Sequence, residues 1–385
     1  MMKKVSITKC ADYELDHVRQ SVRAALEPLG GIGAFVCPGD RVLLKPNLLM
    51  RRRPEKATTT HPAVVQAVSE LVVEAGGKPV IFDSPGGYYY HSRATLDALY
   101  DTCGMKRAAE AGGAELCYDE AAVNAPCPGG RMLKGIETIQ SVLDADKIIN
   151  IPKLKTHMMM AFSGAVKNMF GIVPGRHKTE YHFRFKDEND FASALVDICL
   201  FARPVLSVMD AITGMEGQGP TNGRPRHIGL ILAGAEPWAV DLAAVQVVGL
   251  DAKKVPILRE CANRKLCGMA PDEGDICGER LQDVAIKGFQ KPPNMVAANI
   301  YDWMLPRPVA KWLNRAMKFK PSFRTADCKG CGVCARSCPV QAIMMKKHKP
   351  VFDSSLCISC FCCHELCNYD AININKPWMM RVLFK

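Results

Sequence analysis

The chain has 385 residues, 48% of them hydrophobic, which is typical of a globular protein with two or three domains. It carries 50 Lys and Arg against 39 Asp and Glu, a formal net charge of +11. No apolar run reaches the ~18 residues of a membrane span and no signal-peptide pattern begins the chain, so we expect a cytoplasmic protein. The basic balance suits an anionic small-molecule substrate or an acidic redox partner protein. Because no nucleic-acid-binding module is readable, we expect no nucleic-acid partner.

The first two thirds of the chain alternate apolar runs with helical patterns. Strands are predicted at residues 41–49, 78–83, 115–118, 147–152, 205–210 and 228–233. Helices are predicted at residues 61–76, 93–110, 191–202 and 237–250. This alternation predicts an α/β domain, residues 1–290, with a mostly parallel sheet flanked by helices. Residues 253–285 have no clear pattern and are expected to be irregular.

Residues 291–322 form a Pro-rich, basic linker between the α/β domain and the cysteine-rich end of the chain. Its apolar residues include Trp303 and Trp312 and have the spacing of an amphipathic helix. A helix that packs the domains together is the favoured interpretation, and a membrane-surface anchor is the alternative. We therefore expect no membrane contact.

Residues 323–385 contain a repeated cysteine motif, C-x2-C-x2-C-x3-C. The first copy is Cys328, Cys331, Cys334 and Cys338, and the second is Cys357, Cys360, Cys363 and Cys367. This spacing is typical of a domain with two [4Fe–4S] clusters, in which the fourth cysteine of each copy binds the other cluster. One cluster is then held by Cys328, Cys331, Cys334 and Cys367, and the other by Cys338, Cys357, Cys360 and Cys363. Cys362 is an extra thiol that we do not assign as a ligand.

Zinc is the alternative for paired CxxC motifs, but it leaves the third cysteine of each loop and the duplication unexplained. Clusters of this kind transfer single electrons at a potential of order −400 mV. The motif therefore indicates electron transfer, with any bond-making chemistry placed in the other domain or in a partner.

A basic segment follows the predicted strand at 147–152. Lys153, Lys155 and His157 come directly after the strand, at the edge where open parallel sheets bind ligands. Four more candidates follow among several glycines: Lys167, Asn168, Lys178 and His182. Such a segment suits a carboxylate or phosphate, with a histidine moving protons. We take His157, Lys155, Lys167 and His182 as candidate catalytic residues. The alternative is a solvated basic loop with structural histidines.

Other predicted strand ends supply further substrate-binding candidates. These are Lys45, Asn47, His61, Asp83 and Asp210, which join Lys153, Asn168 and Lys178. Neither a phosphate-binding P-loop nor a dinucleotide fingerprint follows a predicted strand, so a nicotinamide or flavin site has no support.

Several blocks resemble one known family. LLKPNLL (43–49), INIPKLKTH (149–157), GAVKNMFG (164–171) and MDAITGMEGQGP (209–220) are similar to the family called domain of unknown function 362. Residues 328–373 resemble a bacterial-type 2[4Fe–4S] ferredoxin domain, which members of that family often carry. The family implies little about function. In architecture the α/β part is also distantly similar to the lactate racemase group.

Three functions remain open on this reasoning. The first is an iron–sulfur oxidoreductase that delivers electrons to an anionic substrate in the α/β domain. The second is a non-enzymatic electron carrier whose α/β domain docks partners. The third is a non-redox isomerase or transferase with structural clusters. A large α/β domain favours the first over the second, and two clusters favour electron transfer over a structural role.

Overall fold

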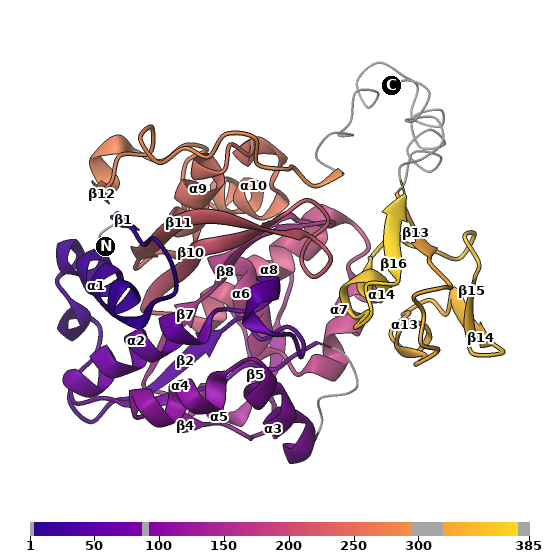
Figure 1. Cartoon of the computed structure of the whole chain (residues 1–385), viewed down its shortest axis with the longest axis horizontal. Helices are drawn as coiled ribbons and strands as arrows, with labels where there is room; N and C mark the ends of the chain where they lie inside the picture. The colour runs from indigo at the N-terminus through magenta and orange to yellow at the C-terminus, as the bar shows by residue number, and fades with distance from the viewer. Residues whose placement is uncertain (1–3, 87–91, 294–318, 376–385) are drawn as a thin grey trace.

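The computed structural model describes residues 4–86, 92–293 and 319–375 (Figure 1). A large α/β domain is followed by a small C-terminal module, drawn in yellow, that lies against one side of it. The amphipathic helix expected within 291–322 falls almost wholly outside the described residues. Among the described helices, none combines the length and apolarity that a membrane crossing requires.

The α/β domain is built on one ten-stranded sheet. In spatial order its main path is β12 (Ile276–Gly278), β1 (Val5–Lys9), β11 (Arg224–Gly234), β10 (Leu206–Glu216), β7 (Lys147–Ile151), β2 (Arg41–Pro46), β3 (Lys78–Ile81) and β4 (Glu115–Leu116). Two more strands, β8 (Lys153–His157) and β9 (Ala161–Ser163), extend it beside β10. The path from β10 to β4 is parallel throughout, and β11 is antiparallel to both its neighbours. The predicted mostly parallel α/β fold is therefore confirmed.

Helices cover both faces of this sheet (Figure 1). One face packs against α1 (Leu15–Leu26), α2 (Pro62–Glu74), α3 (Arg93–Thr102) and α4 (Met105–Gly112). The other packs against α6 (Ala165–Asn168), α8 (Glu188–Ala202), α9 (Pro237–Val247) and α10 (Pro256–Asn263). Side chains of a strand alternate between faces, so Val42 and Leu44 join the first core and Leu43 the second. A hairpin of β5 (Ala122–Pro126) and β6 (Gly135–Ile139), with the short α5 (Gln140–Leu143), borders the second face.

Two sequence predictions differ from the structure. The helix predicted at 93–110 is divided into α3 and α4 at Gly104, whose φ is +77°. A Cβ there would lie 2.9 Å from Pro62 Cγ, so the close approach to the start of α2 requires glycine. The stretch expected to be irregular contains α10, because Ile257, Leu258 and Cys261 bury one side of that helix.

The C-terminal module consists of two strand pairs and two short helices. Strand β13 (Lys320–Phe323) pairs with β16 (Ile372–Asn375), and β14 (Ile343–Lys346) forms a hairpin with β15 (Lys349–Phe352). Helices α13 (Val333–Arg336) and α14 (Cys362–Glu365) each begin inside one cysteine loop.

The two cysteine loops have the same backbone course. Gly330 and Gly332 of the first have φ values of +69° and +73°. Ser359 and Phe361 occupy the same places in the second, with φ values of +60° and +63°. The repeat in the sequence is therefore a repeat in the structure, although its second copy lacks the glycines that accept this conformation at least cost.

Apolar and polar contacts join the module to the α/β domain. Phe361 packs with Phe319, Ile374 and Met158, of which Met158 belongs to the turn after β8. The Arg52 guanidinium lies 2.6 Å from Asp370 Oδ1 and donates to the carbonyl of Cys367 at 3.1 Å. Because the side chain of Arg52 is only 11% exposed, this ion pair is partly desolvated and is stronger than a surface pair.

Replacement of Arg52 tests this contact. Arg52→Ala removes charge-assisted bonds that contribute about 1–2 kcal/mol after discounting for the exposed Asp370. We expect amide hydrogen exchange in residues 369–373 to accelerate about 5–30-fold. The matched control is Arg23→Ala, which removes the exposed Arg23–Glu74 pair. Equal exchange in wild type and Arg52→Ala would show that the pair does not hold the module.

Candidate functional site

A cavity of about 70 Å³ lies where the C-terminal module meets the carboxyl edge of the sheet. Its walls come from the ends of β2, β3 and β8, from α6 and α7 (Lys178–Arg184), and from α14 of the module. Its charged and histidine side chains are Lys45, Lys155, Lys167, Lys178, Asp83, Glu365 and His182. We call it the lysine cavity. It has room for several water molecules or one small anion.

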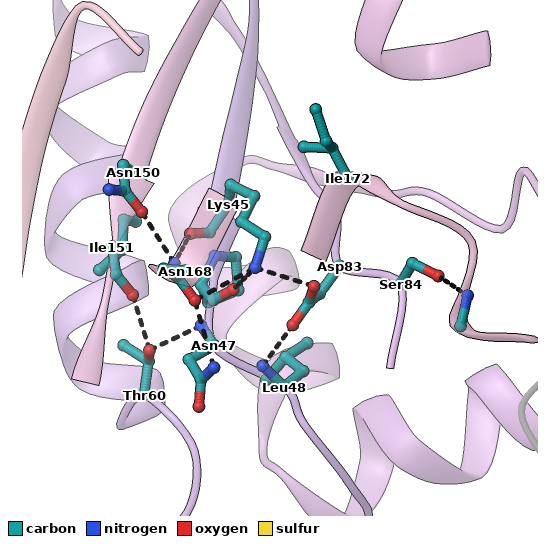
Figure 2. Close-up of polar contacts among 12 residues, drawn as sticks. Lys45, Asn47, Leu48, Thr60, Asp83, Ser84, Asn150, Ile151, Asn168 and Ile172 are labelled. Carbon is teal, nitrogen blue, oxygen red and sulfur yellow. Dashed lines mark hydrogen bonds and ion pairs between the residues drawn. The ribbon is translucent and has the colours of Figure 1, made fainter. Parts of the chain in front are cut away.

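Lys45 and Asp83 form a buried ion pair at the floor of the lysine cavity (Figure 2). Lys45 Nζ lies 2.8 Å from Asp83 Oδ1, while Asp83 Oδ2 accepts from the Leu48 amide at 2.6 Å. Burial lowers the pKa of Lys45, and Asp83 opposes that shift. A Cβ at Gly171 would lie 2.2 Å from both Asp83 Oδ1 and Lys45 Nζ, so only glycine allows the backbone to cover this pair.

Asn168 fixes Lys45 from the neighbouring helix α6. Its Oδ1 accepts from Lys45 Nζ at 3.2 Å, and its Nδ2 donates to Asn150 Oδ1 at 2.8 Å (Figure 2). The α6 turn is held by Asp241, whose carboxylate accepts from the amides of Ala165 and Val166. The strand ends and α6 are thus locked together by side-chain hydrogen bonds.

Lys155 is fully buried and points at neutral acceptors. Its Nζ donates to Asn47 Oδ1 at 2.7 Å and to the carbonyl of Thr58 at 2.8 Å. Burial first, and then the charge of Lys167, hold its pKa well below the ordinary value. The sequence placed Lys155 just beyond the strand predicted at 147–152, whereas the structure shows it in the middle of a separate strand, β8.

Lys167 and Lys178 bring two further ammonium groups that have no carboxylate bonded to them within the described residues. Lys178 donates to the carbonyl of Ser84. Burial lowers its pKa to about 7, a shift that Asp83 opposes and that Lys45 and Lys167 enhance. Burial also lowers the pKa of Lys167, against the attraction of Glu365. Four lysines and two carboxylates thus line this cavity, and burial disfavours the charged form of each lysine.

Glu365 enters this site from the C-terminal module. Its Oε1 lies 3.0 Å from His157 Nε2. Burial alone raises the pKa of Glu365, but His157 and Lys167 hold it well below its ordinary value. His157 Nδ1 accepts from the amides of Met159 and Met160, so Nε2 carries the proton. Burial and Lys167 lower the His157 pKa to about 4, which leaves an ionised Glu365 beside a neutral His157.

The other predicted histidine, His182, lines the cavity itself. Its ring lies 4.4 Å from that of Phe191, and its Nδ1 is buried without a partner among the described residues. Burial lowers its pKa to about 4, so it is neutral near pH 7. His157, by contrast, lies behind Glu365 and does not line the cavity. We therefore regard His157 as a positioning residue for Glu365.

Three predicted substrate-binding residues lie in a separate buried cluster. Lys153 Nζ lies 2.8 Å from Asp210 Oδ2, and the His61 amide donates to the same oxygen at 2.9 Å. Tyr13 joins them: it accepts from Lys153 at 2.7 Å, donates to Asp210 at 2.9 Å and stacks on His61. These groups satisfy one another and do not line the lysine cavity, so we do not place substrate there.

The structure brings one of the two predicted sets of motif cysteines together around a cavity, and the division of all eight between two clusters stays a prediction. Cys328, Cys331, Cys334 and Cys367 line one cavity of the module. Burial and the neighbouring Cys331, Cys367 and Cys328 raise the pKa of Cys334 to about 11. The pKa of Cys363 is also raised, first by burial and then by the neighbouring thiols of Cys360, Cys357, Cys334 and Cys338.

Backbone N–H groups point at three of these sulfurs, from Gly330 to Cys328, from Ser359 to Cys357 and from Ala342 to Cys338, at 3.2–3.4 Å. Groups of four soft thiolates with N–H donors fit [4Fe–4S] clusters, which supply single electrons when bound.

The sequence did not indicate that Glu365 and Cys362 would wall the α/β site. Cys362 lines the lysine cavity, directly before the predicted ligand Cys363. Nothing in the sequence shows where the module docks. Only the extra thiol within the second motif drew attention to this loop.

Comparison with known proteins gives two matching family models. The one described as domain of unknown function (DUF362) matches residues 42–246, and a 4Fe-4S dicluster domain matches residues 327–371. The thylakoid-associated protein sll1697 of Synechocystis sp. is 37% identical over 282 residues, covering 72% of this chain and 83% of that protein.

Among solved structures, the lactate racemase apoprotein from Thermoanaerobacterium thermosaccharolyticum is 14% identical, with a TM-score of 0.38. That match covers 62% of this chain and 56% of the racemase chain, so this chain spans little more than half of it.

The pKa of Lys178 predicts a pH dependence of anion binding. Below about pH 7 its ammonium is charged and attracts an anion, and above that pH it becomes a neutral amine. Oxalate, whose charge is constant over this range, should bind more weakly as the pH rises from 6 to 8, by up to about tenfold per pH unit above the pKa. Calorimetry should show this slope in wild type and in Lys186→Met, which changes an exposed lysine, and no slope in Lys178→Met. Equal wild-type affinity at both pH values would contradict the assignment.

Proposed function

Because this chain belongs to the domain of unknown function 362 family and carries an iron–sulfur dicluster domain of the ferredoxin type, we propose that it is an oxidoreductase that reduces a small anion in the lysine cavity. The observation that carries this proposal is the shared wall. One short helix, α14, holds the predicted ligand Cys363 and also presents Cys362 and Glu365 to the cavity. This wall supports the proposal because a helix that carries a predicted cluster ligand also lines the lysine-rich cavity.

The charge of the cavity supports an anionic substrate. The Lys45–Asp83 pair is internally neutral, whereas Lys155 donates only to neutral acceptors and Lys178 to a backbone carbonyl. Glu365 is one carboxylate facing several cations. An anion that enters the site gains their attraction in a partly water-excluded environment, where electrostatic interactions are strong.

The chain also provides a route for protons. Reduction by two electrons consumes two protons, and the electrons come singly from an external low-potential carrier protein by way of the module. Lys178 has a pKa near 7 and is only half-buried, so it can give a proton to the reduced substrate and recover one from water. His182 and His157, neutral at this pH, are hydrogen-bonding groups and not acids.

The number of clusters is the first testable part of this proposal. Two [4Fe–4S] clusters require about eight irons and eight sulfides per chain. Anaerobically purified Cys362→Ala should keep this content because Cys362 is not a ligand. Cys360→Ala, two residues away, should lose part or all of one cluster. Four or fewer irons in the wild type, or a loss in Cys362→Ala as large as in Cys360→Ala, would contradict the ligand assignment.

The site itself is tested by reoxidation of the reduced protein. Pyruvate, fumarate and sulfite are small anions with different reducible groups and serve as probes. We expect at least one to restore the visible absorbance of the oxidised clusters, and Lys167→Met to slow this at least tenfold at unchanged iron content. Such a loss corresponds to about 1.4 kcal/mol of transition-state stabilisation.

Lys186→Met is the matched control, because it makes the same substitution on an exposed side chain close in sequence. Full activity in Lys167→Met would remove the cavity from the mechanism. If no anion reoxidised the clusters and a carrier protein did, the function would instead be that of an electron carrier.

A further inference from the structure

The predicted cluster ligands differ in their access to solvent. Cys331 is exposed, whereas the other seven are half-buried or buried. Cys331 belongs to the first cysteine loop, while the second loop carries α14 and faces the lysine cavity. A protein that exchanges electrons with this chain therefore approaches the first set most closely at Cys331.

Basic residues occur on the first cysteine loop, on the helix that follows it and on the hairpin that approaches it. Arg336 donates to the carbonyl of Cys331 at 2.8 Å, and Lys329 lines the same cavity as the first cysteine set. The β14–β15 hairpin approaches the loop through Met345 and His348, and the exposed Lys346 and Lys347 lie between these two residues in the chain. The two segments are in close contact, since a Cβ atom added at Gly330 would lie only 2.8 Å from the carbonyl oxygen of His348. We call the surface formed by Lys329, Arg336, Lys346 and Lys347 the basic face.

The acidic residues of the module are engaged elsewhere. Asp327 pairs with Arg324, Asp370 with Arg52, and Asp353 accepts from Ser355, while Glu365 is buried in the lysine cavity. Within the described residues, no carboxylate forms an ion pair with Lys329, Lys346 or Lys347. A cluster with four thiolates carries a charge of about −2, so the three lysines by themselves leave the basic face positive even with the cluster bound.

We propose that the basic face is the docking surface for an acidic, single-electron carrier protein, which exchanges electrons at the Cys331 side of the module. Positive charge around the exposed ligand steers an acidic partner to the orientation in which electron transfer is shortest. Tyr369, 46% exposed and part of the same cavity lining, supplies an apolar contact beside the charges. This inference does not depend on what the lysine cavity binds.

The test uses the full-length, cluster-loaded protein and an acidic flavodoxin as probe. Two measurements are made at ionic strengths of about 0.01 M and 1 M, where the screening length falls from about 30 Å to about 3 Å. One is the affinity for oxidised flavodoxin, and the other is the rate of electron transfer from reduced flavodoxin. We expect Lys346→Glu/Lys347→Glu to lower the affinity and the electron-transfer rate at least tenfold at low salt. At high salt, all proteins should have similar affinities and rates.

The matched control is Lys78→Glu/Arg107→Glu, which changes the net charge equally at exposed positions of the α/β domain. It should behave as wild type, and iron content should be the same in all three proteins. Equal losses in both double variants, or binding without salt dependence, would overturn the proposal. So would loss of binding to phosphatidylglycerol vesicles in the Lys346/Lys347 variant with flavodoxin binding unchanged, because the face would then belong to a membrane surface.

Discussion

The position of Glu365 within a group of cations is the interaction on which the site depends. The α/β domain alone gathers four lysines at one sheet edge, and burial disfavours the charge of each. The carboxylate of Asp83 compensates the charge of one of these lysines, Lys45. Glu365, which arrives with the C-terminal module, lies close to Lys167 and His157 and lowers the cost of the remaining charge. The site is therefore a property of the docked pair of domains and is incomplete in either one.

The topology of the sheet explains why the cavity and the iron–sulfur module lie at the same place. Parallel strands bring their carboxyl ends to one edge, which is why side chains from β2, β3 and β8 meet although they are far apart in sequence. Docking at that same edge places α14 across the opening. The sheet edge thus lines the candidate site and also forms the interface with the module.

Much of this arrangement follows from sequence patterns, and some of it cannot. Lys45, Asn47, Asp83, Lys155, Lys167, Asn168, Lys178 and His182 were predicted at strand ends or in the basic segment, and all eight line the cavity. His61, Lys153 and Asp210 met the same criteria, but they are satisfied by Tyr13, whose position no periodicity indicated. The contribution of Cys362 and Glu365 to the cavity could not be predicted from the sequence, because domain docking depends on surface complementarity between distant segments. The predicted helix boundaries were wrong where a close contact between distant residues, such as that of Gly104 with Pro62, determines the backbone conformation.

The left-handed backbone of Phe361 makes the two halves of the cysteine repeat unequal. A non-glycine residue in that conformation costs on the order of 1 kcal/mol, which the first loop avoids with Gly332. In return, Phe361 packs with Met158, Phe319 and Ile374 and orients the second loop toward the large domain. A module with its halves exchanged would keep the spacing of all eight cysteines and lose its means of attachment. The repeat therefore has an intrinsic direction, set by contacts of its second half, those of Phe361 and the pairing of Asp370 with Arg52, and not by the spacing of the cluster ligands.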